Sequence, residues 1–310
     1  MSIVVIGAVF VDLKGYPEDQ YIPGGRNVGK VVQVHGGVSR NVAEDIANVE
    51  LRPVFVSVVD HSGISTDVIE NLNRHRVNTQ YIARTDDGLG TWLAIFNNTG
   101  DVVASISKRP DLSAISDILD EHGDEIFAEA DSIVVEIDME VPLLKKIFAL
   151  AEKHGKNIYA VVSNMSIAMT RRDLIKKTSC IVCNDQEAGL LFSEEYEDTD
   201  PEDLRRIIAE KVIQAQIPCL VVTMGAKGAV YAELGGKSGY VPAGKVDVID
   251  TAGAGDAFFA GAAIGLSYGK TTREACRIGT RLAASVIASR ENVCPRFLPG
   301  EFGLETEKNR

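Results

Sequence analysis

Short, continuous apolar runs alternate along this chain with segments of helical periodicity, and this alternation is the strongest constraint on its fold. Runs of β-branched and other apolar residues without polar alternation cover residues 3–11, 53–59, 132–137, 157–162, 179–183 and 219–224. Amphipathic helical patterns lie between them, over residues 39–50, 115–130, 141–155 and 201–216. Strands that are apolar on both faces and separated by helices are typical of a parallel sheet covered on both sides. The sequence therefore predicts an α/β fold, a doubly wound and mostly parallel sheet flanked by helices.

Two segments interrupt this alternation and predict a second, smaller sheet. Residues 12–36 contain several glycines and prolines without a helical period, and residues 90–107 read as two strands joined by a turn at 97–100. Open α/β sheets bind ligands at the carboxyl ends of their strands. We expect the two segments to meet there as a small β-sheet lid that excludes water from a reaction. The prediction is one domain over residues 1–310 with this discontinuous lid.

The bulk composition narrows the possible partners. The chain is 45% hydrophobic and 25% charged, as in an ordinary globular protein. A net charge of −12 argues against a nucleic-acid partner, which usually selects a basic surface. No window approaches the roughly 18 uninterrupted apolar residues of a membrane span, and the apolar N-terminus lacks the basic region of a signal peptide. We therefore expect a cytoplasmic protein that binds neither nucleic acid nor membrane.

The cysteines are expected to be structural. Their odd number, five, suggests reduced thiols. Cys180 and Cys183 form a CxxC pattern inside a predicted strand, where residues three apart point to opposite faces. They are therefore expected to be buried separately and not to share a metal.

The stretch DTAGAGDAFFAG, residues 250–261, carries the clearest chemical signal. It follows a predicted hairpin (229–234 and 238–243) and a predicted strand at 246–249, and it opens the first of two predicted helices, at 254–268 and 272–289. The first turn of a helix offers unpaired amides to an anion. Asp256 beside them has two interpretations: a base that removes a proton from an attacking hydroxyl, or a favourable charge on the helix dipole. The chemistry alone leaves both open.

This stretch resembles the C-terminal signature of the ribokinase/PfkB family of carbohydrate and nucleoside kinases, at every restricted position from 250 to 263. Residues 35–47, HGGVSRNVAEDIA, resemble the N-terminal signature of the family, with a departure at Glu50, where glycine is usual. Residues 184–187 match its NxxE motif, and residues 223–228 match its TxGxxG nucleotide loop. The four motifs occur in the family's order and span nearly the whole chain, so the resemblance implies a ribokinase-like fold and an ATP-dependent kinase.

The resemblance also implies roles for individual residues. Asp256 is then the general base, with an anion hole made by the backbone of Gly253, Ala254 and Gly255. Glu187 organises Mg²⁺, mostly through water, and its alternative is an exposed acid at a helix start. Asp250 marks a K⁺ site, together with the loop after Ala288. Residues expected to bind the nucleotide are Asn184, Thr223, Gly225, Lys227, Gly228 and Thr251. Residues expected to bind the sugar or nucleoside are Asp12, Gly36, Gly37, Asn41 and Trp92; the alternative for Asn41 is a solvent-facing helix residue, and for Trp92 a core or dimer contact.

The substrate is less constrained. The N-terminal signature and the lid stretch resemble the pseudouridine-kinase-like branch, which favours a primary hydroxyl of a pseudouridine-like nucleoside or a ribose-like sugar. Arg40, Lys108 and Arg109 raise a second possibility, a sugar phosphate held by a basic cluster. A third is a binding protein of the same fold without turnover.

Residues 265–271 resemble a P-loop, but only three residues separate the glycines where four are needed.

The lid also predicts an assembly. Trp92, Ala94 and Phe96 share one face of their strand, and Thr91, Leu93 and Ile95 share the other. Both faces are largely apolar, which is unfavourable for a flap exposed to water on two sides. We expect one face to cover the ligand and the other to form a homodimer through the lids.

Overall fold

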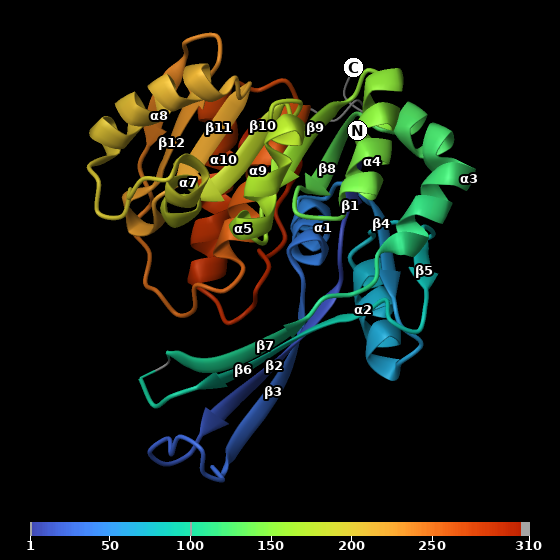
Figure 1. The fold of residues 1–310 in the computed structure, drawn as a ribbon, viewed down its shortest axis with the longest axis vertical. Coiled ribbons are helices and arrows are strands. Elements are labelled where there is room, and N and C mark those ends of the chain that lie inside the picture. The colour runs from blue at the N-terminus through green and yellow to red at the C-terminus, as the bar shows by residue number, and fades with distance from the viewer. Residues whose placement is uncertain (1, 100, 305–310) are drawn as a thin grey trace.

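The main body is a nine-stranded sheet, and the prediction of a mostly parallel α/β sheet is confirmed. A computed structural model describes residues 2–99 and 101–304. The strand order is β13-β12-β11-β10-β9-β8-β1-β4-β5, parallel from β11 to β5 and antiparallel at the β11–β12–β13 edge (Figure 1). The strands are β1 (Ile3–Ile6), β4 (Val54–Val59), β5 (Ile82–Arg84), β8 (Ser132–Glu136), β9 (Asn157–Val161), β10 (Cys180–Asn184), β11 (Cys219–Thr223), β12 (Ala229–Glu233) and β13 (Ser238–Val241).

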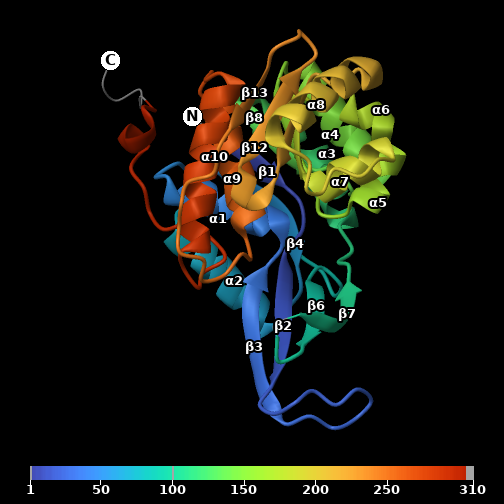
Figure 2. The same ribbon diagram turned by 90° about the vertical axis from the view of Figure 1, so that its left-hand side faces the viewer.

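Helices cover both faces of this sheet, which Figure 2 shows nearly edge-on. One layer contains α1 (Val38–Asn48), α2 (Gly63–Arg74), α9 (Ala254–Ser267) and α10 (Thr272–Ile287). The other contains α3 (Ser113–Glu129), α4 (Val141–Lys153), α5 (Met165–Ala168), α6 (Arg172–Ile175), α7 (Asp185–Phe192) and α8 (Pro201–Ala215). Three short 3₁₀ turns complete the described elements: Met169–Arg171, Gly225–Lys227 and Pro299–Phe302.

The two layers explain why the strands are apolar throughout. Alternate residues of one strand enter two different cores: Ile3 and Val5 pack under α1 and α9, whereas Val4 and Ile6 pack on the opposite face. Cys180 and Cys183 divide in the same way and are both buried as free thiols. The expectation that the two thiols are buried on opposite faces of the sheet is therefore confirmed.

The two interrupting segments form a separate four-stranded sheet of order β3-β2-β6-β7. Its strands are β2 (Phe10–Pro17), β3 (Gly29–Gly36), β6 (Gly90–Phe96) and β7 (Val102–Lys108). Two antiparallel pairs, β2–β3 and β6–β7, are joined by the parallel pair β2–β6. This small sheet projects from the end of the main sheet at which β1 finishes (Figure 1). It therefore faces the carboxyl ends of the parallel strands.

Two expectations about strands were wrong. Residues 3–11 are not one strand, because the chain leaves the main sheet after Ile6 and enters the small sheet at Phe10. A side chain at Gly7 would collide with Ser39 Oγ of α1. The chain therefore leaves the main sheet at a position under α1 where only glycine fits. Asp12 consequently lies within β2 and not at the end of the first strand.

Residues 246–249 form no strand either. The amides of Ile249 and Asp250 both donate to the carbonyl of Ile287, at the end of α10. These hydrogen bonds hold the segment against a helix end instead of a sheet edge, and Val248 and Ile249 remain exposed.

No helix within residues 2–99 and 101–304 is long and apolar enough to cross a bilayer.

Candidate active site

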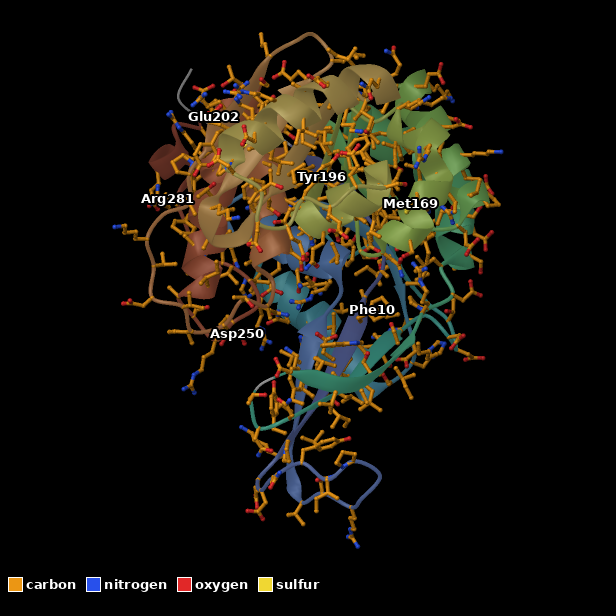
Figure 3. The ribbon with its side chains drawn as sticks, turned by 60° about the vertical axis from the view of Figure 1, so that its left-hand side comes forward. Phe10, Met169, Tyr196, Glu202, Asp250 and Arg281 are labelled. Carbon is orange, nitrogen blue, oxygen red and sulfur yellow. The ribbon has the colours of Figure 1, made fainter. Side chains whose placement is uncertain are left out.

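A cavity of about 590 Å³ lies between the main sheet and the small sheet. Its walls come from β2, α1, β6, the ends of β7 and β8, the start of α5 and the start of α9. Figure 3 shows Phe10 at the root of the small sheet and Asp250 in the loop before α9, both on the side of the main body that faces this space. Six residues predicted from sequence to bind substrate or act on it line this inter-sheet cavity: Asp12, Gly37, Asn41, Trp92, Gly253 and Asp256.

Asp256 lies in the first turn of α9 and carries a defined hydrogen bond. Asn41 Nδ2, from α1, donates to Asp256 Oδ2 at 2.7 Å. Burial raises the pKa of Asp256 to about 6, while the Asn41 hydrogen bond and the nearby Arg40 lower it. The carboxylate is thus ionised at neutral pH but is a much stronger base than an exposed aspartate. Asn41 does not face solvent, so its alternative interpretation is wrong.

The helix start beside Asp256 leaves backbone donors free. Gly253 is the N-cap residue with φ of 79°, a conformation that favours glycine. Within the described chain, no partner takes the amides of Gly253, Gly255 and Asp256, whereas the amide of Ala254 donates to the Thr251 carbonyl at 3.3 Å. Of the three residues expected to form the anion hole, Gly253 and Gly255 therefore keep free amides and Ala254 does not, while Asp256 adds a third free amide.

Asp12 reaches the cavity from the small sheet. Pairing across the sheet places it between Val34 of β3 and Trp92 of β6. A Cβ at Gly36 would lie 2.5 Å from Asp12 Oδ1, so the glycine leaves room for the carboxylate. Burial raises the pKa of Asp12, opposed by the positive charges of Lys14 and Arg40. Its oxygens accept no hydrogen bond from the described residues, which leaves them free to bind hydroxyl groups.

The residues expected to bind nucleotide meet at the ends of two adjacent strands. Asn184 ends β10 and pairs with Thr223, which ends β11. Asn184 Oδ1 accepts the amide of Glu187 at 2.7 Å, and Glu187 Oε2 accepts the amide of Asn184 at 2.8 Å. This capping box fixes the start of α7. One oxygen of Glu187 therefore caps the helix, while Oε1 stays without a partner among the described residues. The side chain is half-buried, so Glu187 is not the exposed acid of the alternative interpretation.

The rest of the nucleotide loop follows β11. Gly225 and Gly228 have φ of 53° and 106°, and a side chain at Gly228 would collide with the Val241 carbonyl. Lys227 points to the loop before α8, where Nζ lies 3.3 Å from the Thr199 carbonyl oxygen and 3.8 Å from Asp198 Oδ1. The Lys227 ammonium group thus already has partners in the loop before α8.

Few of the described side chains that could bind a metal ion lie near the residues expected to bind Mg²⁺ and K⁺. No group of three or more His, Cys, Asp or Glu side chains gathers as a metal site among residues 2–99 and 101–304. Burial raises the pKa of Glu187, and the Asn184 amide that it accepts lowers it. Asp250 Oδ1 accepts the amide of Ala252 at 2.9 Å. This arrangement suits a dication that keeps most of its water ligands better than a dication bound directly by several carboxylates.

Sequence reasoning missed one buried acid in the cavity, Glu136. Its Oε1 accepts the amides of Ser39 and Ala8 at 3.1 and 3.3 Å. Burial and the neighbouring Asp138 raise the pKa of Glu136 to about 7. The available signal was an acidic residue at the carboxyl end of an otherwise apolar strand, where ligand-binding side chains are expected.

The three cations considered for a phosphate do not converge. Arg40 is 2% exposed, pairs with Glu44 at 2.7 Å and lines a separate cavity behind β3. Lys108 pairs with Asp87 at 2.5 Å. Only Arg109 lines the inter-sheet cavity, and it is bound to Asp138 at 2.9 Å. No basic cluster forms from them.

These features together define a class of protein. A doubly wound α/β body with an ionised carboxylate beside free helix-start amides, open to a small-molecule cavity, is equipped to transfer a phosphoryl group to a hydroxyl. Residues 1–294 match the pfkB family carbohydrate kinase profile. The chain belongs to this family and is a sugar or nucleoside kinase, as its motifs predicted.

Individual relatives cover nearly the whole chain. The guanosine-inosine kinase of Exiguobacterium acetylicum is 32% identical over 94% of this chain and 96% of its own length. The pseudouridine kinase of Escherichia coli is 26% identical over 84% of this chain and 82% of its own length. Among solved structures, Arabidopsis thaliana ribokinase complexed with ribose and ATP superposes with a TM-score of 0.82 at 18% identity, over 98% of this chain and 99% of that one. The ribokinase-like fold is therefore confirmed.

Proposed function

We propose that this enzyme transfers the γ-phosphoryl group of ATP to the primary hydroxyl of a ribonucleoside. The observation that carries the proposal is the hydrogen-bonded pair Asn41–Asp256, placed at the cavity wall beside the three free amides of α9. A base and an anion site within one helix turn are what in-line transfer to a hydroxyl requires.

Each residue then has a definite task. ATP supplies the transferred group, and Mg²⁺, when bound, would supply positive charge that neutralises its phosphates. Asp12 accepts hydrogen bonds from ring hydroxyls and so orients the sugar. Asp256 accepts the proton of the primary hydroxyl as the hydroxyl oxygen bonds to phosphorus and ADP leaves. The amides of Gly253, Gly255 and Asp256 donate to the phosphoryl oxygens and stabilise their charge. Glu187 would hold the ion, through one of its waters, with its free oxygen Oε1.

A neutral nucleoside fits the cavity better than a sugar phosphate. Lys108 and Arg40 are paired elsewhere, so among the described residues only Arg109 and Lys14 bring positive charge to the cavity wall. Trp92 offers a ring on which a base can stack. Two relatives that match most of the chain are named for nucleosides, one for guanosine and inosine and one for pseudouridine. We therefore place purine ribonucleosides beside pseudouridine as the first substrates to test.

The test is a phosphorylation screen with ATP and Mg²⁺. The panel contains inosine, guanosine, pseudouridine, adenosine, ribose, fructose and a hexose phosphate. We expect the highest kcat/KM with one of the nucleosides. Preference for free ribose or for a sugar phosphate over every nucleoside contradicts the proposal.

We further propose that the small sheet is a lid and that Asp250 marks a K⁺ site. The amide of Asp250 donates to Ile287 at 3.3 Å, which places Asp250 beside the loop after Ala288. Asp250 and this loop would hold the cation close to the start of α9. Faster turnover in K⁺ than in a large organic cation supports this site, and equal rates contradict it.

A homodimer through the lids completes the proposal. On the outer face of the small sheet, Leu93 pairs with Ile106, and Val31 lies two strands away. Val31 and Ile106 are 73% and 70% exposed. A second copy of this chain would remove these apolar side chains from water.

A further inference from the structure

The loop after α10 brings one side chain to the hydrogen-bonded pair at the cavity. Asn292 Nδ2 donates to the carbonyl of His35 at 2.8 Å and to Asn41 Oδ1 at 3.3 Å. Asn41 Nδ2 in turn donates to Asp256 Oδ2. A continuous chain of hydrogen bonds therefore runs from the end of β3, through Asn292 and Asn41, to Asp256.

The direction of these bonds fixes the orientation of the Asn41 amide. The two ends of an asparagine amide have nearly the same shape, and only hydrogen bonds distinguish them. If the Asn41 amide were reversed, its NH₂ would face the NH₂ of Asn292 and its oxygen would face the carboxylate of Asp256. Both contacts are repulsive, so the donor on Asn292 directs the NH₂ of Asn41 to Asp256.

The backbone around Asn292 is held firmly to the same helix that carries Asn41. The amide of Cys294 donates to Asp45 Oδ1 at 2.6 Å, and Asn48 Nδ2 donates to the carbonyl of Cys294 at 2.7 Å. The carbonyl of Asn292 also packs on Gly253, where a Cβ would collide with it. Asn292 therefore has a fixed position relative to α1 and to the start of α9.

We propose that Asn292 is a positioning residue for Asp256, which orients Asn41 as a donor to the carboxylate and connects it to the lid strand β3. The proposal rests on the proposed function, in which Asp256 is the base. Asn292 also lines the inter-sheet cavity, but the proposal requires no contact between it and the substrate.

The proposal predicts a change in the pH profile. A donor to the ionised carboxylate lowers its pKa, so a disordered Asn41 amide raises the pKa of Asp256. The acid limb of kcat/KM then moves to higher pH. Other charged groups around Asp256 come from separate elements and stay in place when Asn292 is changed: Asp12, Lys14, Arg40, Asp45, Arg109, Glu136 and Glu187.

The experiment compares wild type, Asn292→Ala, Asn41→Ala and the double variant. We expect Asn292→Ala to lower kcat about 10-fold, to leave KM for ATP unchanged, and to move the acid limb upward by about half a pH unit to one unit. In the Asn41→Ala background, Asn292→Ala should have no further effect. Additive losses, or an unshifted acid limb, would overturn the proposal.

Controls separate this outcome from a general disturbance. Arg296→Gln removes an exposed side chain four positions further along, paired with Glu50 at 2.5 Å, and should leave kcat and the pH profile unchanged. If Asn292→Ala does not fold, Asn292→Leu keeps the volume without donors and gives the same expected result. Asp256→Asn is measured in parallel: if it stays active, the base assignment and this proposal both fail. If it is inactive while Asn292→Ala matches wild type, only this proposal fails.

Discussion

At the scale of single residues, Asp256 combines a raised pKa with a donor that keeps it ionised. Asp256→Asn keeps the shape and the Asn41 contact but cannot accept a proton. We expect a folded protein in which kcat falls about 10²–10⁴-fold, the usual contribution of a positioned base. Steady-state kinetics with a thermal melt as folding control measures this. Near-full activity in the variant would remove the base assignment.

The same carboxylate sets the response of activity to pH. The pKa of Asp256 is raised to about 6 by burial, so the fraction of ionised base is lost as pH falls through 6. We expect kcat/KM to decline tenfold per pH unit below that point. Glu136, with a pKa near 7, lines the same cavity, and the profile of Glu136→Gln distinguishes the two groups. An acid limb that vanishes in Glu136→Gln would assign it to Glu136 instead.

Asp12 belongs to the substrate half of the site. Its carboxylate has no partner among the described residues and faces the cavity from the small sheet. Asp12→Ala removes two acceptors for ring hydroxyls, so we expect KM for the nucleoside to rise about 10-fold or more. KM for ATP should change little. Equal effects on both constants would place Asp12 outside the substrate pocket.

At the scale of elements, the start of α9 depends on a backbone conformation that side chains disfavour. Gly253 has φ of 79° and packs against the Asn292 carbonyl, whereas Gly255 has open space at its Cβ position. We expect Gly253→Ala to destabilise the fold by about 2 kcal/mol or more, since it adds strain and a collision. Gly255→Ala is the matched control and should not lower the free energy of unfolding. Denaturant unfolding of both variants measures the contrast, and similar losses would show that the geometry at Gly253 is not limiting.

At the scale of the whole molecule, the small sheet has one face toward the cavity and an apolar face outward. Trp92 lines the cavity, and Tyr16 stacks on Phe96 at 4.7 Å on that inner side. We expect a dimer by light scattering at micromolar concentration and a monomer after Ile106→Glu, because the charge cannot be buried at the interface. Ile213→Glu, at a residue 51% exposed on α8, is the control and should remain dimeric. A monomeric wild type with full activity argues against assembly through the lids.

Much of the fold and part of the candidate site were determined by local patterns in the sequence. Continuous apolar runs require a sheet buried on both faces, so the parallel strands, their helices and the lid segments were predictable from periodicity. Gly253, Gly255 and Asp256 were also visible, because glycines beside a carboxylate at a helix start have few structural uses. These features could be predicted because each depends on residues that are close together in the sequence.

Tertiary structure alone decided how distant residues meet. The roles of Glu136 and Asn292, and the departure of the chain from the main sheet after Ile6, could not be predicted from the sequence. Each depends on contacts with residues more than 30 positions away. The pairing of Arg40 with Glu44 instead of a phosphate depends on which side of α1 faces the cavity. Residues 246–249 have strand-like composition, yet two hydrogen bonds to Ile287 hold them at a helix end. Burial and the contacts that the tertiary fold permits, not the local preference of the sequence, settled these outcomes.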